Sequence, residues 1–142
     1  MRLWKRLGVA TSTLGRLASG VRRSALPAKL EAPAIGRYSE DVEAAVYFCC
    51  VESLQNAAKH AGLGATAVIR LSQRDGRLDF EIVDDGVGFD VESARGSGSG
   101  YTNMTDRMAS VRGTLSVDSA HGRGTAVRGS VPVAHQAPSV RA

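Results

Sequence analysis

The hydrophobic period of this chain changes after residue 61, and that change limits the possible folds more than any other feature. Over residues 40–61 apolar side chains recur at helical spacing. Ser39 stands where a helix cap is expected, acidic residues fill the first turn, and Gly62 follows a basic last turn. The sequence therefore predicts one long helix from about residue 40 to residue 61.

After this helix the hydrophobic period becomes two. The segments ATAVIRLS (65–72) and LDFEIVD (78–84) both alternate, and residues 74–77, Arg-Asp-Gly-Arg, supply a turn between them. The two segments form a predicted β-hairpin. In its second strand the alternation puts Asp84 on the same side as the large apolar residues, so this carboxylate is expected on the buried face.

The rest of the chain predicts one more helix and two more strands. The helix covers about residues 102–112 and ends at Gly113, and the strands cover residues 114–119 and 125–132. The resulting order is helix, two strands, glycine loop, helix, two strands, with no βαβ repeat. This order predicts an α+β fold, a sandwich in which a sheet carries its helices on one face.

Composition limits the chain to one globular domain with basic and loose ends. It has 142 residues, 43% of them apolar, and no apolar run approaches the ~20 residues of a membrane span. Residues 1–37 hold eight Lys and Arg against one acid, a net charge of +7, whereas residues 38–142 hold ten against thirteen, a net charge of −3. We expect a disordered or amphipathic tail or linker at 1–37, a domain at 38–133 and a disordered tail at 134–142.

Charge and cysteine content also bear on location and partners. The two cysteines, Cys49 and Cys50, are adjacent, which suits neither a disulfide framework nor a metal site and fits a reducing cytoplasm. Because the positive charge lies in the tail and not in the domain, no specific nucleic-acid partner is expected. The tail suits an anionic surface or another protein.

The first candidate site lies on the long helix. Glu52, Asn56, Lys59 and His60 fall on one stripe, since they are spaced by four, seven and eight residues from the first. An ordinary amphipathic helix with its polar face in water explains the same pattern.

Three glycine-containing segments follow. Asp84-Asp85-Gly86-Val87-Gly88 ends a strand, where a carboxylate can accept a hydrogen bond from an amine and glycines allow close approach, although Asp-Gly is also a common turn. Residues 96–100, Gly-Ser-Gly-Ser-Gly, precede a predicted helix and suit either phosphate oxygens or a flexible linker. Residues 122–125, Gly-Arg-Gly-Thr, enter the last strand, where a plain turn serves equally well.

Taken together and in this order, the four segments resemble a known family. ESLQNAAKHAG is similar to the N box, DDGVGF to the G1 box, GSGSGYTNMTDR to the G2 box and GRGT to the G3 segment of GHKL ATPases. The chain most resembles the ATP-binding catalytic domain of bacterial sensor histidine kinases of the nitrate-sensor-like class, over residues 38–133. The resemblance implies a Bergerat ATP-binding fold, a two-layer α/β sandwich with a mixed, mostly antiparallel sheet.

The resemblance implies a role for each residue of the helix stripe. Asn56 would hold Mg²⁺ through its amide oxygen, together with the phosphates of ATP. Glu52 would act as a catalytic residue that polarises the attacking group. Lys59 and His60 would lie toward the phosphates, and both are expected to be catalytic.

The remaining cofactor-binding residues come from the glycine-containing segments. The resemblance implies that Asp84 accepts a hydrogen bond from the adenine amine, that Gly86 and Gly88 shape the adenine pocket, and that Thr125 supports it. Gly98 and Gly100 would form the hinge of a lid over the triphosphate.

Two departures from the family pattern are mild. Tyr101, also expected to contact the cofactor, stands where the family usually has Leu, and Gly113 stands alone where the family often has a glycine pair.

The expected activity is transfer of the γ-phosphate of ATP to a histidine on a separate dimerisation domain or partner kinase, with a response regulator downstream. Sensor kinases of this class carry that histidine on a helical hairpin before the ATP domain, whereas residues 1–37 contain no histidine, and His60, His121 and His135 lie elsewhere. Two alternatives stay open: a serine kinase similar to the anti-sigma-factor serine kinases, and a module from a truncated kinase that binds nucleotide without transferring phosphate.

Overall fold

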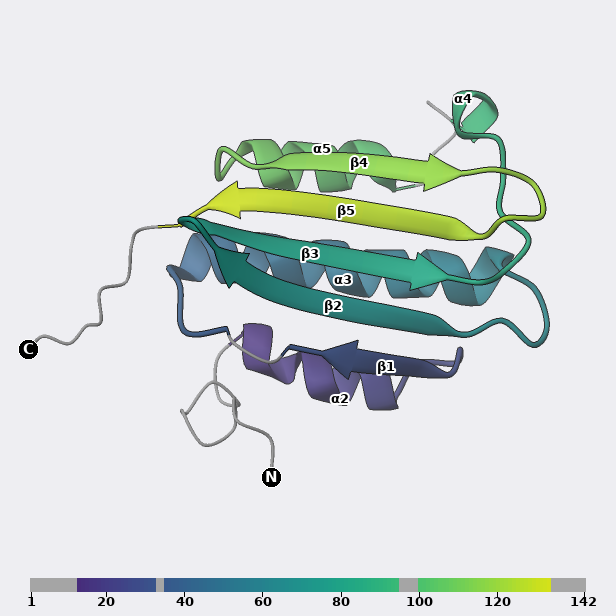
Figure 1. The fold of residues 1–142 in the computed structure, drawn as a ribbon, viewed down its shortest axis with the longest axis horizontal. Coiled ribbons are helices and arrows are strands. Elements are labelled where there is room, and N and C mark those ends of the chain that lie inside the picture. The colour runs from purple at the N-terminus through teal and green to yellow at the C-terminus, as the bar shows by residue number, and fades with distance from the viewer. Residues whose placement is uncertain (1–12, 33–34, 95–99, 134–142) are drawn as a thin grey trace, which may run out of the picture.

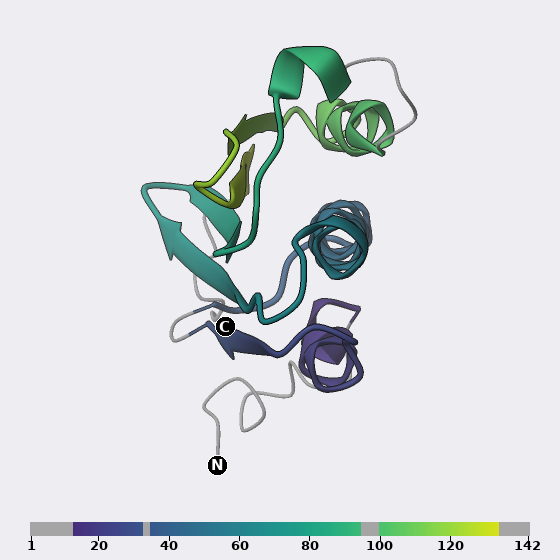
Figure 2. The same cartoon turned by 90° about the vertical axis from the view of Figure 1, so that its right-hand side faces the viewer.

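A five-stranded sheet with helices packed on one of its faces forms the core of this protein. The computed structural model describes residues 13–32, 35–94 and 100–133. Figure 2 shows α2, α3 and α5 together on one side of the sheet. In chain order the elements are η2 (Leu14–Arg16), α2 (Leu17–Arg22), β1 (Ala28–Glu31), α3 (Glu40–His60), β2 (Ala67–Arg74), β3 (Arg77–Asp84), α4 (Val91–Ala94), α5 (Tyr101–Ala109), β4 (Thr114–Ser119) and β5 (Thr125–Pro132).

The strand order confirms the predicted fold class. Within the described residues the strands lie in the order β1-β2-β3-β5-β4 (Figure 1). The β1 strand runs parallel to β2, and every other neighbouring pair is antiparallel. The fold is therefore an α+β two-layer sandwich with a mixed, mostly antiparallel sheet. No helix of the described residues is long and apolar enough to span a bilayer.

The long helix and the hairpin form where the local signals predict them. The Ser39 hydroxyl accepts a hydrogen bond from the N–H of Val42 at 3.3 Å and so caps α3. Asp75 and Gly76 both have positive φ, +52° and +73°, which is the backbone of a tight hairpin turn between β2 and β3. The inner face of β3 buries its apolar residues and Asp84, as the alternation predicts.

The second helix ends three residues earlier than predicted. The α5 helix stops at Ala109, and the chain then turns through Arg112, which has a φ of +64°. The N–H of Gly113 donates to the carbonyl of Met108 at 2.7 Å and closes the turn. A β-carbon on Gly113 would lie 2.9 Å from the carbonyl oxygen of Ser130, so the turn packs tightly against β5.

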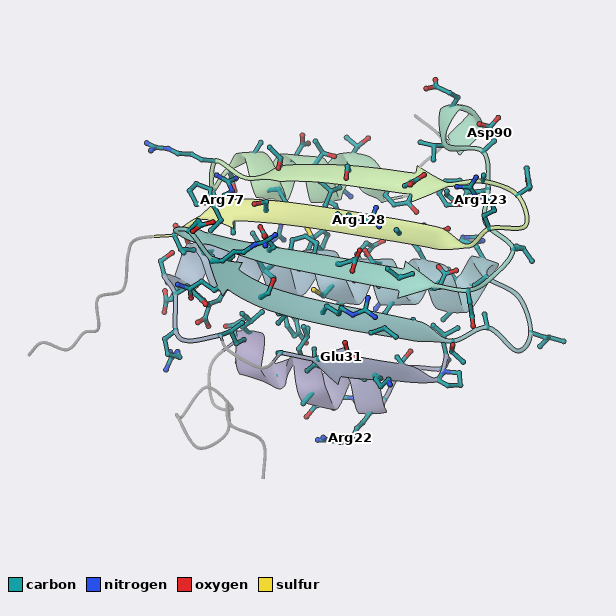
Figure 3. All side chains as sticks on the ribbon, in the orientation of Figure 1. Arg22, Glu31, Arg77, Asp90, Arg123 and Arg128 are labelled. Atoms are coloured by element: carbon teal, nitrogen blue, oxygen red, sulfur yellow. The ribbon has the colours of Figure 1, made fainter. Side chains whose placement is uncertain are left out.

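The outer face of the sheet is a ladder of alternating charges. Arg70 Nε lies 2.9 Å from a carboxylate oxygen of Glu31, and Arg70 also contacts Glu81 at 3.2 Å. Glu81 in turn accepts from Arg128 at 2.8 Å. Figure 3 shows Glu31 and Arg128 on this face, over β1 and β5. The charges pair with one another across four strands, on the face of the sheet opposite the helices.

Residues 14–31 differ from the tail or linker that the sequence predicted for residues 1–37. Leu14 and Leu17 are 2% and 1% exposed against the helix layer, and β1 adds a strand to the sheet, with Leu30 opposite Ile69. The charge count misses this packing because the arginines of the segment point into water, while its few leucines all lie on the buried side. Residues 1–12 and 134–142 lie outside the described residues.

A buried carboxylate joins this N-terminal segment to α3. Glu43 is 3% exposed and lies in the first turn of α3. It accepts hydrogen bonds from the N–H of Leu14 at 3.4 Å and from the N–H of Tyr38 at 2.9 Å, and Arg37 Nε lies 3.5 Å away. The two backbone donors come from either side of β1, so one side chain holds both ends of the segment.

Removing this carboxylate should loosen the N-terminal segment. In Glu43→Ala two backbone N–H groups lose their acceptor, and we expect the free energy of unfolding to fall by about 1–3 kcal/mol, measured by urea denaturation. Limited trypsin digestion should then cut after Arg22, in α2, and after the neighbouring Arg16 and Arg23 faster than in the unmodified chain. The matched control is Glu40→Ala, an exposed acid in the same turn. Equal stability of the two variants would contradict this role for Glu43.

Candidate functional site

Three polar side chains lie side by side where β3, β5 and β4 meet at one end of the sheet. Asp84 pairs with Thr125, and Thr125 pairs with Ser119, in adjacent strands. Each of the three stands two positions from an apolar residue of its own strand, since Asp84 follows Ile82, Ser119 follows Val117 and Thr125 precedes Val127, so all three face the helix layer. The C-terminal end of α3 lies at this same end, and α5 begins on that side, on the right in Figure 1.

Asp84 is the buried member of this row. It is 8% exposed, and the N–H of Gly86 donates to its Oδ1 at 2.8 Å. Burial raises the pKa of Asp84 above its ordinary value, although hydrogen bonds from the backbone of Gly86 and of Thr125 oppose that rise. The side chain thus presents a partly desolvated acceptor to the space between sheet and helices.

The neighbouring carboxylate, Asp85, points away from this space. It accepts the N–H of Thr66 at 2.6 Å and the hydroxyl of Thr66 at 3.0 Å, and these bonds lower its pKa. Asp85 therefore ties the loop after β3 to the loop before β2. Of the two adjacent aspartates, Asp84 therefore belongs to the candidate site, whereas Asp85 holds two loops together.

Neighbouring segments of the chain leave no room for a side chain at Gly86 or at Gly88. A β-carbon on Gly86 would lie 2.4 Å from the β-carbon of Ala61, at the end of α3, and one on Gly88 would lie 2.0 Å from the carbonyl oxygen of Ala120. Gly88 also has a φ of +68°. The sequence predicted that these glycines let the chain approach a flat base, and the structure adds that they let this loop pack between α3 and the β4–β5 turn.

Of the four polar residues of α3 that the sequence analysis selected, two are half-buried and two are exposed to water. Glu52 and Asn56 are half-buried, whereas Lys59 and His60 are exposed in the last turn. Gly100, with a φ of +91°, begins α5 against Glu52, since a β-carbon there would lie 2.5 Å from Glu52 Oε2. Gly98, the other predicted lid glycine, lies outside the described residues.

Tyr101, the first residue of α5, lies between the sheet end of the candidate site and its α3 residues. Its ring stacks on Phe89, with centroids 5.8 Å apart and planes 19° apart. Burial raises the pKa of Tyr101 to about 12, with further contributions from the negative charges of Asp84 and Glu52. The first residue of α5 is thus close to both the sheet end and the α3 stripe.

Metal binding at this site depends on few protein ligands. In residues 13–32, 35–94 and 100–133 no group of three or more His, Cys, Asp and Glu side chains is placed to hold an ion. Asn56 offers an amide oxygen one helical turn from Glu52. A Mg²⁺ ion there would need phosphate and water oxygens for most of its shell, and Mg²⁺ commonly binds in this way.

Ser119 is a site residue that the sequence analysis missed. Its hydroxyl accepts from the N–H of Phe89 at 2.9 Å, donates to the carbonyl of Gly124 at 3.0 Å and lies 2.7 Å from the hydroxyl oxygen of Thr125. A signal was present, because alternation in the strand at 114–119 places Ser119 on the apolar face at the strand end, as it does for Asp84.

Comparison with known proteins agrees with this geometry. Residues 41–135 match the family model described as histidine kinase-, DNA gyrase B-, and HSP90-like ATPase. The oxygen sensor histidine kinase NreB of Staphylococcus carnosus (strain TM300) is 35% identical over 98 residues, which are 68% of this chain and 28% of NreB. The sensor histidine kinase LiaS of Bacillus subtilis (strain 168) is 28% identical over 95 residues, 67% of this chain and 26% of LiaS.

A solved structure of another histidine kinase shares this fold. The blue-light activated histidine kinase EL346 of Erythrobacter litoralis superposes with a TM-score of 0.73 at 23% identity, over 94% of this chain and 43% of that protein. The chain spans about a quarter of the length of the two curated relatives. Because the family model matches residues 41–135, more than half of the chain, this chain belongs to the histidine kinase-, DNA gyrase B- and HSP90-like ATPase family.

Proposed function

We propose that this chain is the ATP-binding catalytic domain of a sensor histidine kinase. It binds ATP with Mg²⁺ and transfers the γ-phosphate to a histidine on a separate dimerisation domain or partner kinase. A response regulator lies downstream of that histidine. The observation that supports this best is that the start of α5 links the sheet end to α3. The Tyr101 ring stacks on Phe89, whose N–H donates to Ser119 at the sheet end, and the preceding Gly100 packs against Glu52.

Recognition of the base belongs to the sheet end. Asp84 offers carboxylate oxygens in a partly desolvated position, and the 6-amino group of adenine donates hydrogen bonds. Thr125 lies opposite Asp84 in the next strand and supports the same edge of the base. Gly86 and Gly88 hold the loop that frames this pocket against α3 and the β4–β5 turn.

The triphosphate lies along α3 and the start of α5. Asn56 holds Mg²⁺, which neutralises phosphate charge when bound, while Lys59 and His60 are exposed at the same end of the helix for contact with phosphate oxygens. Gly98 and Gly100 serve as the lid hinge. Gly100 already packs on the Glu52 carboxylate, so movement of the lid and placement of Glu52 are coupled.

Glu52 orients the acceptor for transfer. The acceptor imidazole nitrogen forms a bond to the γ-phosphorus as the bond from that phosphorus to its bridging oxygen breaks, and ADP leaves. Glu52 accepts a hydrogen bond from the imidazole and keeps the attacking nitrogen in line. The chemistry is chiefly positioning, so the acceptor must be delivered by a separate helical element.

Binding of Mg-ATP by the purified chain tests the first step, and Asp84→Asn tests the base pocket. An amide can present a donor where the adenine amine also donates, so ATP affinity should fall by roughly 1–3 kcal/mol, measured by calorimetry. The matched control is Asp79→Asn, on the same strand but on the outer face, where Asp79 accepts from Ser130 at 2.6 Å. Unchanged affinity in Asp84→Asn removes this residue from the adenine role.

A further inference from the structure

The loop after β3 carries a half-buried aromatic side chain, Phe89, that packs against the start of α5. Its ring stacks on the ring of Tyr101, with centroids 5.8 Å apart and planes 19° apart. The backbone N–H of Phe89 donates to the hydroxyl of Ser119 at 2.9 Å. The Phe89 ring therefore contacts α5 from a backbone that is fixed at the end of the sheet.

Two further backbone bonds make this loop a firm support. The N–H of Val87 donates to the carbonyl of Ala61, the residue that follows α3, at 2.9 Å. The N–H of Gly122 donates to the carbonyl of Val87 at 2.6 Å. The loop is thus bound to the end of α3 and to the β4–β5 turn, and neither bond involves α5.

The α5 helix has few anchors of its own. Of its nine residues only Met104 and Met108 are buried, and methionine side chains are flexible, so they fill space without fixing one position. The last turn has a second contact, because the guanidinium of Arg107 lies over the Phe48 ring, 4.3 Å from its centroid. The first turn depends instead on the stacked ring of Tyr101.

The residue before Tyr101 reaches the carboxylate on α3. Gly100 has a φ of +91°, and a β-carbon there would lie 2.5 Å from Oε2 of Glu52. We propose that Phe89 is a positioning residue, which holds the start of α5 by stacking on Tyr101 and so keeps the Glu52 carboxylate in place for transfer. This inference rests on the proposed function, in which Glu52 orients the acceptor.

Loss of packing beside the proposed base pocket is the competing explanation for any effect of Phe89. A purely structural role would weaken nucleotide binding and transfer together. A positioning role acts chiefly on the rate, because ATP stays bound while Glu52 is displaced. Phe89→Leu separates the two, since it removes the aromatic face but keeps the backbone bond to Ser119.

The experiment measures the affinity of the 142-residue chain for Mg-ATP by calorimetry. It also measures the rate of transfer, at saturating Mg-ATP, to a separately supplied hairpin that bears an acceptor histidine. In Phe89→Leu the rate should fall about threefold to tenfold, as expected for the loss of one aromatic pair, while the dissociation constant changes by less than about twofold. Phe89→Tyr keeps the aromatic face and should keep most of the rate. The matched control is Val111→Ala, a half-buried apolar residue just beyond the other end of α5, which should leave both quantities unchanged.

Hydrogen exchange supplies a readout that needs no activity. The N–H of Met104 donates to the carbonyl of Gly100 at 3.1 Å, which is the first backbone bond of α5. This amide should exchange faster in Phe89→Leu and in Tyr101→Leu, and at the original rate in Val111→Ala. Adding Phe89→Leu to Tyr101→Leu should slow transfer no further than Tyr101→Leu alone, because both changes remove the same contact.

An unchanged transfer rate in Phe89→Leu, or an equal loss of affinity and rate, overturns the inference and leaves the proposed function standing. Unchanged exchange of the Met104 amide in Phe89→Leu overturns it as well. Failure of the unmodified chain to bind ATP or to transfer phosphate overturns the proposed function itself. In that case the exchange result still decides whether Phe89 holds the start of α5.

Discussion

Replacing Asn56 by alanine is expected to abolish Mg²⁺-dependent ATP binding, whereas Glu52→Ala should keep ATP and lose phosphoryl transfer. Asn56 is proposed to supply the protein oxygen for the metal, and the triphosphate depends on that metal for charge neutralisation. Glu52 lies one turn earlier on α3 and acts on the acceptor, so its loss should lower the rate roughly 10²–10⁴-fold with little change in affinity.

Calorimetry with and without Mg²⁺ measures the binding of each variant, and transfer to a separately supplied histidine-bearing hairpin measures the rate. Gln55→Ala is a suitable control, because Gln55 lies on the same helix but is exposed. The two variants therefore distinguish a loss of ATP binding from a loss of phosphoryl transfer. Equal loss of nucleotide in both would mean that this division of roles between Asn56 and Glu52 is wrong.

A preparation of these 142 residues incubated with ATP should not phosphorylate itself on histidine. Transfer needs the acceptor nitrogen in line with the γ-phosphate at contact distance, and neither histidine of the described residues lies on a separate helical element that could deliver it there. His60 is fixed on the rigid last turn of α3 beside the proposed phosphate position, and His121 lies in the exposed β4–β5 turn. His135 lies outside the described residues and beyond the last strand.

Radiolabelled ATP followed by acid treatment measures this result, because acid removes phosphate from histidine and spares phosphate on serine. Adding a helical hairpin that carries the acceptor histidine of a related kinase should restore labelling in trans. The reaction should be slow, since a bimolecular encounter replaces a tethered one. Acid-labile label on the chain alone contradicts the prediction. Acid-stable label on an added protein partner would favour a serine kinase instead.

Most of the fold could be predicted because its signals are local. The α3 helix follows from its cap at Ser39 and its apolar spacing, and the β2–β3 hairpin follows from alternation around Asp75 and Gly76. The N-terminal segment could not be predicted because its order depends on partners far along the chain. Leu14 is held by Glu43, 29 residues later, and β1 pairs with a strand that begins at Ala67.

The candidate site also has one part that local sequence patterns predict and another that they do not. Alternation alone placed Asp84 on the buried side, and helical spacing placed Glu52 and Asn56 on one stripe. The stacking of Phe89 on Tyr101 and the three bonds of Ser119 join segments that no local pattern relates. The tight packing of Gly86 and Gly88 against other backbone segments could not be predicted for the same reason. A sequence shows where a glycine stands, but it does not show which distant residue packs against it.

The parallel edge strand has a consequence for the order of folding. The β2–β3 hairpin closes over a two-residue turn, an event of microseconds, whereas β1 must meet a strand about 39 residues away, after α3 has formed between them. We therefore expect β1 and α2 to join the sandwich last and to open first. In hydrogen exchange their amides should form a separate, less protected unit than those of β3 and β5, so the N-terminal segment can detach while the proposed nucleotide site stays folded.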